Sequence, residues 1–216
     1  RPLLIGDILR VSQELDGVQI DFEAVARDDA GAFHDFLRDL RAALPAGKTL
    51  SIAVPARTKT IADAWEYARI ATLVDRMVIM AYDEHWSTSA PGPIASLPWC
   101  TNVVDFALTA IPPRKIIMGL PLYGRAWQDK PLARALRFEN TRDLVAQTGS
   151  EVGYASETGP SFSYTESVVV TVFFENARSL GEKLALYAAR GVPAVSFWRI
   201  GQGPPQLGRG IDLAAA

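Results

Sequence analysis

Asp21 and Glu23 are the two residues of this chain whose types and spacing best fit acid catalysis. They close an alternating apolar run that predicts a buried strand over about residues 17–23. Side chains two positions apart share one face of a strand, so Gln19, Asp21 and Glu23 are expected to point the same way. In such a pair, burial and mutual repulsion let one carboxylate stay ionised while its neighbour holds a proton. The pattern therefore predicts general acid chemistry, against the simpler reading of a salt-bridged strand end.

The elements that must position these acids alternate between strands and helices. Near-continuous apolar runs predict further strands at about 50–54, 77–82, 116–120 and 194–198. Helical spacing of apolar residues predicts helices at about 3–15, 29–44, 60–74 and 176–190. The third of these helices would open at Thr60-x-x-Asp63, which resembles a capping box. This order predicts an α/β fold with a parallel sheet that is covered on both faces.

The interval before the last strand is about twice as long as the others. Residues 128–175 are therefore expected to form an insertion, with Ser161–Tyr164 and Val168–Phe174 as an antiparallel pair within it. No internal repeat accompanies it.

Polar and aromatic residues follow the other expected strands. Tyr82 and Asp83 close the third strand, Tyr123 and Arg125 follow the fourth, and Trp198 ends the fifth. The carboxyl ends of parallel strands meet at one rim of a sheet, where functional side chains gather. The sequence therefore predicts a site at this rim, with a structural ion pair and a ligand contact both open for Arg125.

Composition excludes several classes of function. With 22 basic against 24 acidic residues the net charge is −2, which provides no basic face for nucleic acid. No apolar run reaches the ~20 residues that span a bilayer, and Cys100 as the single cysteine excludes an intrachain disulfide and a cysteine-based metal cluster. The consecutive Asp83, Glu84 and His85 would diverge on an extended segment, and His34 is expected to be exposed on its helix. We therefore expect neither a metal nor a cofactor.

The motifs taken together resemble glycoside hydrolase family 18, the chitinase-like (β/α)8 barrels. Residues 16–23 match the family's Asp-Gly-x-Asp-x-Asp-x-Glu except at Gln19, and Met80-Ala-Tyr-Asp83 matches its Met-x-Tyr-Asp. Gly119-Leu-Pro-Leu-Tyr-Gly-Arg125 and Phe197-Trp198 resemble the segments of its seventh and eighth strands. Finer features, among them Tyr82-Asp-Glu-His85, resemble the bacterial branch related to spore-cortex-lytic N-acetylglucosaminidases.

The resemblance implies a TIM barrel of which residues 1–216 hold strands four to eight, with an α+β insertion between strands seven and eight. The first and last strands would then be unpaired edges. We accordingly expect either a longer natural protein that supplies the missing N-terminal part of the barrel, or self-association.

The resemblance also implies a mechanism. Glycosidases of this family are substrate-assisted: the 2-acetamido oxygen of the sugar is the nucleophile. Glu23 would be the acid and base, Asp21 would hold the acetamido nitrogen, and Tyr82 would bind its carbonyl. Trp198 would form the floor under the sugar. Further substrate contacts are expected from Gln19, Met80, Asp83, Tyr123 and Arg125.

The implied function is hydrolysis of β-1,4 bonds next to N-acetylglucosamine in peptidoglycan or a chitin-like glycan, and the resemblance favours an extracytoplasmic or cell-envelope location. Many family members carry aspartate at the position of Gln19, and the neutral amide removes one negative charge beside Asp21. Two alternatives stay open: a carbohydrate-binding domain without catalysis, and a barrel fragment that is inactive without further strands.

Overall fold

The computed structural model describes residues 1–129, 136–156 and 159–203. The chain divides into two compact units. Unit 1 consists of Arg1–Arg125 and Phe173–Ala216, and unit 2 of Ala126–Val172.

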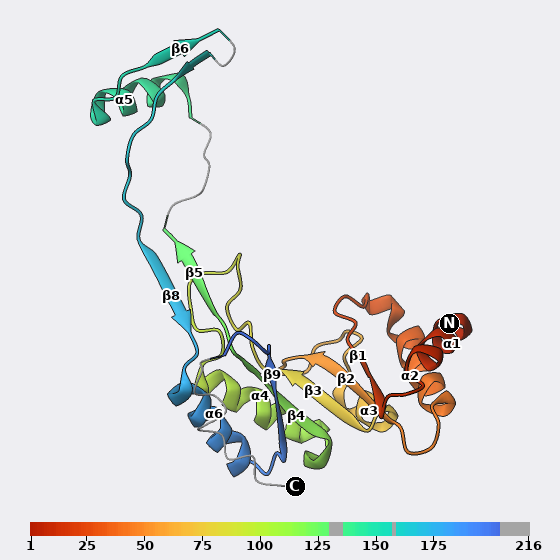
Figure 1. Cartoon of the computed structure of the whole chain (residues 1–216). Helices are drawn as coiled ribbons and strands as arrows, with labels where there is room; N and C mark the ends of the chain where they lie inside the picture. The colour runs from red at the N-terminus through yellow and green to blue at the C-terminus, as the bar shows by residue number, and fades with distance from the viewer. Residues whose placement is uncertain (130–135, 157–158, 204–216) are drawn as a thin grey trace. The chain divides into compact units, whose positions relative to one another are not determined.

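A five-stranded parallel sheet forms the centre of unit 1 (Figure 1). Its strands, in spatial order, are β1 (Gly17–Ile20), β2 (Thr49–Pro55), β3 (Arg76–Met80), β4 (Ile116–Pro121) and β9 (Ala194–Trp198). Spatial order follows chain order, so every connection leads to the adjacent strand, as in successive βα units. All five strands expected from the sequence are present, and within the described residues β1 and β9 are the edges of the sheet.

Five helices accompany the strands of unit 1. They are α1 (Pro2–Val11), α2 (Ala30–Ala43), α3 (Tyr67–Leu73), α4 (Leu97–Ala110) and α6 (Ala177–Ala189), with short 3-10 turns η1 (Arg27–Asp29) and η2 (Pro113–Lys115). Neighbouring helices pack against each other in this same order. Within the described part of the chain, none of the helices has the length and apolarity needed to cross a bilayer.

The core lies between this row of helices and one face of the sheet. Ile20, Ile52, Met77 and Ile116 are partners in the register of adjacent strands, and all four are buried. Side chains alternate across a strand, so the next residues along each strand belong to the opposite face. On that face Gln19, on the edge strand, is exposed, whereas Ala53 and Val78 in the central strands are buried. The opposite face is thus buried at its centre, although the row of helices packs on the first face.

Unit 2 contains a helix and a short hairpin. Helix α5 (Phe138–Thr148) is followed by β6 (Gly153–Ala155) and β7 (Gly159–Ser161), which pair antiparallel. The strands β5 (Gly124–Gln128) and β8 (Val170–Phe174) form a separate two-stranded sheet. The expected pairing of Ser161–Tyr164 with Val168–Phe174 is wrong, because both segments pair with other partners.

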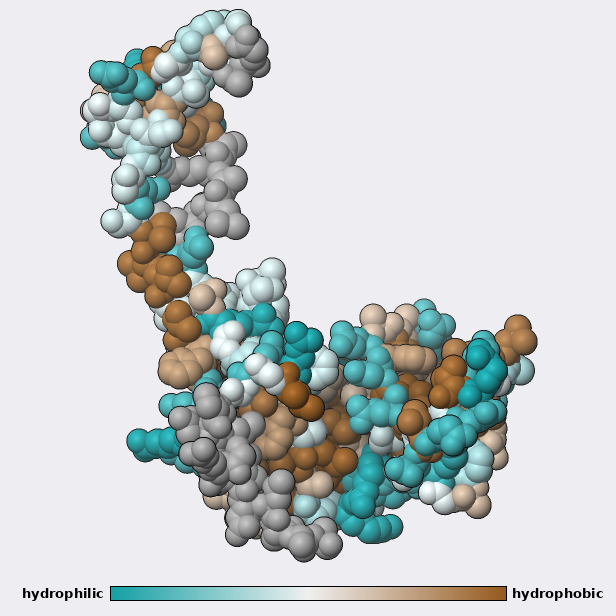
Figure 2. All heavy atoms as spheres, viewed as in Figure 1, coloured by the Kyte–Doolittle hydropathy of each residue, from teal (hydrophilic) through white to brown (hydrophobic). Residues whose placement is uncertain are grey.

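Several apolar side chains are exposed on the surface. Figure 2 shows hydrophobic residues over β8, where Val170 and Val172 are about half exposed. In unit 1, the exposed apolar residues near the N-terminus are Leu3, Leu4, Val11 and Leu15.

Three local expectations need correction. The first strand ends at Ile20 rather than near residue 23. Helix α3 begins at Tyr67, and Asp63 accepts hydrogen bonds from the Trp65 backbone and the Arg57 side chain instead of capping a helix at Thr60. His34 is buried, with its Nε2 3.0 Å from the carbonyl oxygen of Ala64.

Candidate active site

Asp21 and Glu23 lie in the segment that directly follows β1. Gly17 fixes the start of this strand against β2: a Cβ on Gly17 would lie 2.3 Å from the carbonyl oxygen of Thr49, so no larger residue fits. Phe22, between the two acids, packs its ring on Phe33 and Phe36 of α2, with centroids 6.1 and 5.6 Å away. Phe22 thus packs on the helix, while Asp21 and Glu23 on either side of it line a cleft.

These acids line a cleft in unit 1 with a volume of about 370 Å³. The cleft brings together most of the residues singled out in the sequence. Its lining consists of Asp21, Glu23, Met80, Tyr82, Asp83, Tyr123, Gly124, Arg125, Trp198 and Gln202. The residues come from the ends of β1, β3, β4 and β9 and from the start of β5, which is the rim where the parallel strands end.

Both carboxylates are solvent-exposed, contrary to the expectation that burial helps to separate their protonation states. The reason is that β1 is an edge strand whose one described partner is β2. Within the described residues neither carboxylate accepts a protein hydrogen bond, so both remain available to a ligand.

Tyr82 lines the cleft just after the end of β3. Its backbone N–H donates to the carbonyl of Met80 (2.8 Å), so the chain turns as soon as β3 ends. Burial, as the largest cause, and the negative charges of Asp21, Asp83 and Glu23 together raise the pKa of Tyr82 to about 12. The phenol therefore stays a neutral hydrogen-bond donor at ordinary pH.

Asp83 is held by the two residues expected after the fourth strand. Its Oδ1 accepts from the hydroxyl of Tyr123 (2.5 Å) and from Nη2 of Arg125 (2.7 Å). Arg125 also lies 5.5 Å from the centre of the Tyr123 ring. Asp83 adopts a positive φ of 57°, a conformation that aspartate tolerates better than most residues. The hydrogen bond to Asp83 raises the pKa of Arg125, so its charge is firmly paired.

Trp198 ends β9 with half of its surface exposed. Its carbonyl accepts from the backbone N–H of Leu122 (2.7 Å), which ties the end of β9 to the end of β4. The exposed indole face is a surface on which the apolar face of a sugar ring can stack.

Gln19 is the one predicted site residue that does not line this cleft. Its amide oxygen accepts a hydrogen bond from the hydroxyl of Ser51 on β2 (3.3 Å). Gly124 and Gln202 also line the cleft, although they were not expected from the sequence.

Asp83, Glu84 and His85 diverge in the structure. Glu84 accepts from the backbone and hydroxyl of Ser96 (2.7 and 3.1 Å), and His85 Nδ1 lies 2.9 Å from the carbonyl of Pro93. The three side chains therefore serve three different contacts. Within the described residues no cluster of histidine, cysteine or acidic side chains is arranged to hold a metal ion.

The geometry can be compared with known proteins. The family model of the glycosyl hydrolases family 18 matches residues 5–203. A putative sporulation-specific glycosylase of Bacillus subtilis is 35% identical over 195 residues, which cover 85% of this chain and 46% of that protein. The cortical fragment-lytic enzyme of Bacillus cereus is 31% identical, and 50% of its length is covered. The chain thus spans about half the length of these curated relatives.

Solved structures give the same result. The crystal structure of the spore cortex-lytic enzyme of Bacillus cereus is similar with a TM-score of 0.75 and 32% identity, covering 95% of this chain and 51% of that one. A chitinase from Chromobacterium violaceum has a TM-score of 0.73 and 30% identity, with 95% and 68% covered.

These similarities also explain the one-sided arrangement of helices. In a TIM-barrel-like α/β fold the helices form an outer ring, and the other face of the sheet turns inward. The parallel sheet of unit 1, with its helices in one row and its polar rim, fits this arrangement. The chain belongs to the glycosyl hydrolases family 18.

Proposed function

We propose that this protein is a glycosidase that hydrolyses β-1,4 bonds next to N-acetylglucosamine, with retention of configuration and with Glu23 as acid and base. One observation carries the proposal: Glu23 and Asp21 line the same cleft as Tyr82 and Trp198. An acid, a second carboxylate, a neutral donor and an aromatic floor are the groups that an acetamido sugar needs for substrate-assisted cleavage.

The first step breaks the glycosidic bond. Glu23 donates its proton to the bridging oxygen while the acetamido carbonyl oxygen of the same sugar attacks the anomeric carbon. The leaving sugar departs as an alcohol, and a cyclic oxazolinium ion remains. Asp21 accepts a hydrogen bond from the acetamido N–H and offsets the developing positive charge.

The second step consumes water. The Glu23 carboxylate takes a proton from a water molecule, whose oxygen attacks the anomeric carbon and opens the oxazolinium ring. Two inversions at this carbon give net retention. Glu23 ends the cycle protonated, as it began.

Tyr82 orients the acetamido group by donating its hydroxyl to the carbonyl oxygen. The raised pKa of Tyr82 supports this role, because its hydroxyl keeps the proton that it donates even at pH values well above neutral. Trp198 lies under the sugar ring, while Met80, Asp83, Tyr123 and Arg125 supply further contacts from the cleft wall. Gln19 lies outside the lining of this cleft, bonds to Ser51 and is not assigned a substrate contact.

The two edge strands of the described sheet, β1 and β9, indicate how a complete barrel would be closed. Backbone groups on the outer sides of β1 and β9 need partners if the sheet is to close into a barrel. We propose that the five strands are strands four to eight of such a barrel, closed by further strands or by a second chain. Residues 128–175 would then form an insertion subdomain between strands seven and eight of the chain.

Replacement of Glu23 by glutamine tests the catalytic assignment. Glu23→Gln keeps the size and removes the proton, so turnover should fall by about 100-fold or more while sugar binding is kept. Glu14→Gln makes the same chemical change at an exposed position outside the cleft and should leave turnover unchanged. Equal turnover of the parent and the Glu23 variant would refute the assignment. Binding without product release by the parent would favour a carbohydrate-binding domain.

A further inference from the structure

The cleft continues past Glu23 into a second lobe with a volume of about 470 Å³. Glu23, Met80, Tyr82 and Asp83 line both lobes, so the two lobes join at these residues. The remaining residues of the second lobe come from the end of β2, the loop after β3 and the start of α4. They are Pro55, Ala56, Arg57, Glu84, Trp86 and Trp99.

The position of Glu23 sets the direction in which a substrate lies, if the proposed function holds. A general acid must reach the oxygen between two sugars, so one sugar lies on each side of it. Asp21 and Trp198, the partners of the sugar that reacts, line the first lobe alone. The second lobe therefore receives the leaving sugar.

The chemistry of the second lobe differs from that of the first. Trp86 offers a half-exposed indole, and Arg57 is the one basic side chain among the described residues that line the lobe. A guanidinium has five N–H donors. Arg57 uses Nη2 towards Asp63 (2.6 Å) and Nη1 towards the carbonyl of Ala56 (3.3 Å), while its Nε is buried without a hydrogen-bond partner. The buried Nε is out of reach of a ligand, but one N–H on each Nη atom is left to donate.

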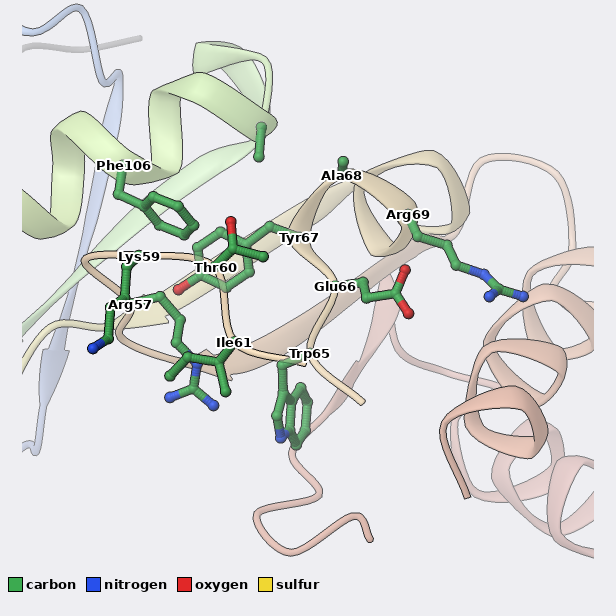
Figure 3. Close-up of a pocket in the computed structure, with 11 residues that line it drawn as sticks. Arg57, Lys59, Thr60, Ile61, Trp65, Glu66, Tyr67, Ala68, Arg69 and Phe106 are labelled. Atoms are coloured by element: carbon green, nitrogen blue, oxygen red, sulfur yellow. The ribbon is translucent and has the colours of Figure 1, made fainter. Parts of the chain in front are cut away.

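Asp63 holds this arginine in place. Its Oδ2 accepts from Arg57 while its Oδ1 accepts from the backbone N–H of Trp65 (2.8 Å), so the carboxylate is fixed at both oxygens. Figure 3 shows Arg57 with Lys59, Thr60 and Ile61 of the same loop around a smaller adjoining hollow. The side chain of Arg57 is about one-fifth exposed and lines both this hollow and the second lobe, so the fold orients it while part of it stays accessible.

We propose that Arg57 binds a carboxylate on the leaving sugar, and that the second lobe thereby selects an acidic amino-sugar over a neutral one. Guanidinium and carboxylate match in planar, charge-assisted hydrogen bonds. A sugar of this class is N-acetylmuramic acid, whose lactyl ether ends in a carboxylate, whereas every sugar of chitin is neutral. The substrate class is therefore a glycan in which N-acetylglucosamine is followed by a carboxylate-bearing hexosamine.

The test compares matched tetrasaccharides. One alternates N-acetylglucosamine with N-acetylmuramic acid, the second is the same molecule with its carboxylates converted to carboxamides, and the third contains N-acetylglucosamine alone. Binding is measured calorimetrically in the Glu23→Gln protein, and kcat/KM in the protein with Glu23 intact. Arg57→Gln, Arg57→Lys and Arg69→Gln are compared in both, since Arg69 is an exposed arginine on α3 outside the second lobe.

The acidic tetrasaccharide should bind about tenfold more tightly than its carboxamide, as expected for a charge-assisted contact. Arg57→Gln should abolish this preference without weakening the binding of the neutral chains. Arg57→Lys should keep part of it, and Arg69→Gln all of it. The comparison of substrates on one variant is an internal control, because misfolding would weaken all three alike.

Two results would overturn the proposal: an equal affinity of the unaltered Arg57 protein for the acid and its carboxamide, or an equal loss for all substrates in Arg57→Gln. Failure of the proposed function has a different signature. In that case no substrate is cleaved, while the calorimetric preference still decides the role of Arg57.

Discussion

Tyr82 connects the acids to the rest of the cleft at the scale of single residues. Its ring meets Tyr123 edge-on at 6.3 Å, and Tyr123 holds Asp83. Three carboxylates raise its pKa in addition to burial. The hydroxyl is thus surrounded by groups that favour its neutral form.

The pH dependence of turnover should reflect this environment. A raised pKa keeps the Tyr82 hydroxyl protonated beyond the ordinary tyrosine value of 10.0 and up to about 12. We expect no loss of kcat from ionisation of this phenol between about pH 8 and pH 10. Tyr82→Phe should lower kcat about 100-fold. A kcat that falls with a pKa near 10 in the parent, and not in Tyr82→Phe, would contradict the assignment.

Gly119 on β4 positions this tyrosine. A Cβ at Gly119 would lie 2.8 Å from the carbonyl oxygen of Ile79 and 3.0 Å from the Tyr82 ring. Gly119→Ala should displace the ring and lower kcat by roughly 10- to 100-fold, with a smaller change in KM. Gly181→Ala on α6 meets no atom within 4 Å and should instead add about 0.5–1 kcal/mol of stability. An unchanged kcat in Gly119→Ala would show that Gly119 is not needed to position Tyr82.

At the scale of elements, a buried ion pair anchors the start of α6. Lys183 Nζ lies 2.7 Å from Glu175 Oε2, and the two side chains are only 4% and 6% exposed. The hydroxyl of Ser179 donates to the same carboxylate oxygen (2.6 Å). The pair joins the segment after β8 to the helix that leads into β9, and thus to Trp198.

Lys183→Met should leave the Glu175 carboxylate buried without its cation. The expected loss of unfolding free energy is about 3–5 kcal/mol. Arg178 forms an exposed ion pair with Glu182 on the same helix, where its side chain is 89% exposed, so Arg178→Met should change stability by less than about 1 kcal/mol. Urea unfolding of both variants measures the difference. Equal midpoints would show that burial of the pair is unimportant.

The sequence predicted the elements better than their ends. Every strand of the parallel sheet was expected, because continuous apolar runs between helical patterns are a strong signal. The strand with the acids stops at Ile20 because its pairing with β2 ends there, a tertiary limit that alternation does not reveal. Helix α4 was missed, although Ser96 caps it by accepting from the backbone N–H of Trp99.

The rim rule predicted the first lobe of the cleft and missed the second. The sequence pointed to residues at or just after the ends of β1, β3, β4 and β9, and these residues line the first lobe. The same rule applied to β2 leads directly to Arg57, two residues after the strand. The burial of His34 was not predictable from its helix alone, because its contact is with Ala64, thirty positions away in the sequence.

At the scale of the whole molecule, four tyrosines should make the stability of the fold sensitive to alkaline pH. Burial is the largest cause of a raised pKa at Tyr67, Tyr82, Tyr123 and Tyr187. The folded state therefore keeps protons that the unfolded chain releases above pH 10. The contribution of these tyrosines to the free energy of unfolding should be fully present below about pH 10. It should be lost progressively as the pH rises towards 12.

Urea midpoints at about pH 8 and about pH 11 check this expectation. We expect a lower midpoint at the higher pH, and a smaller drop in Tyr82→Phe, which lacks one of the four groups. Equal midpoints would mean that these phenols are not protected by the fold.

The products of digestion test the proposed hydrolysis most directly. Purified peptidoglycan and N-acetylglucosamine oligomers are digested side by side by the parent and by Glu23→Gln, and the products are identified by mass spectrometry. The parent should release chains with N-acetylglucosamine at the new reducing end, each cleavage adding one water, and Glu23→Gln should release almost none. Products from both proteins in equal yield, or none from the parent despite binding, would contradict the proposed hydrolysis.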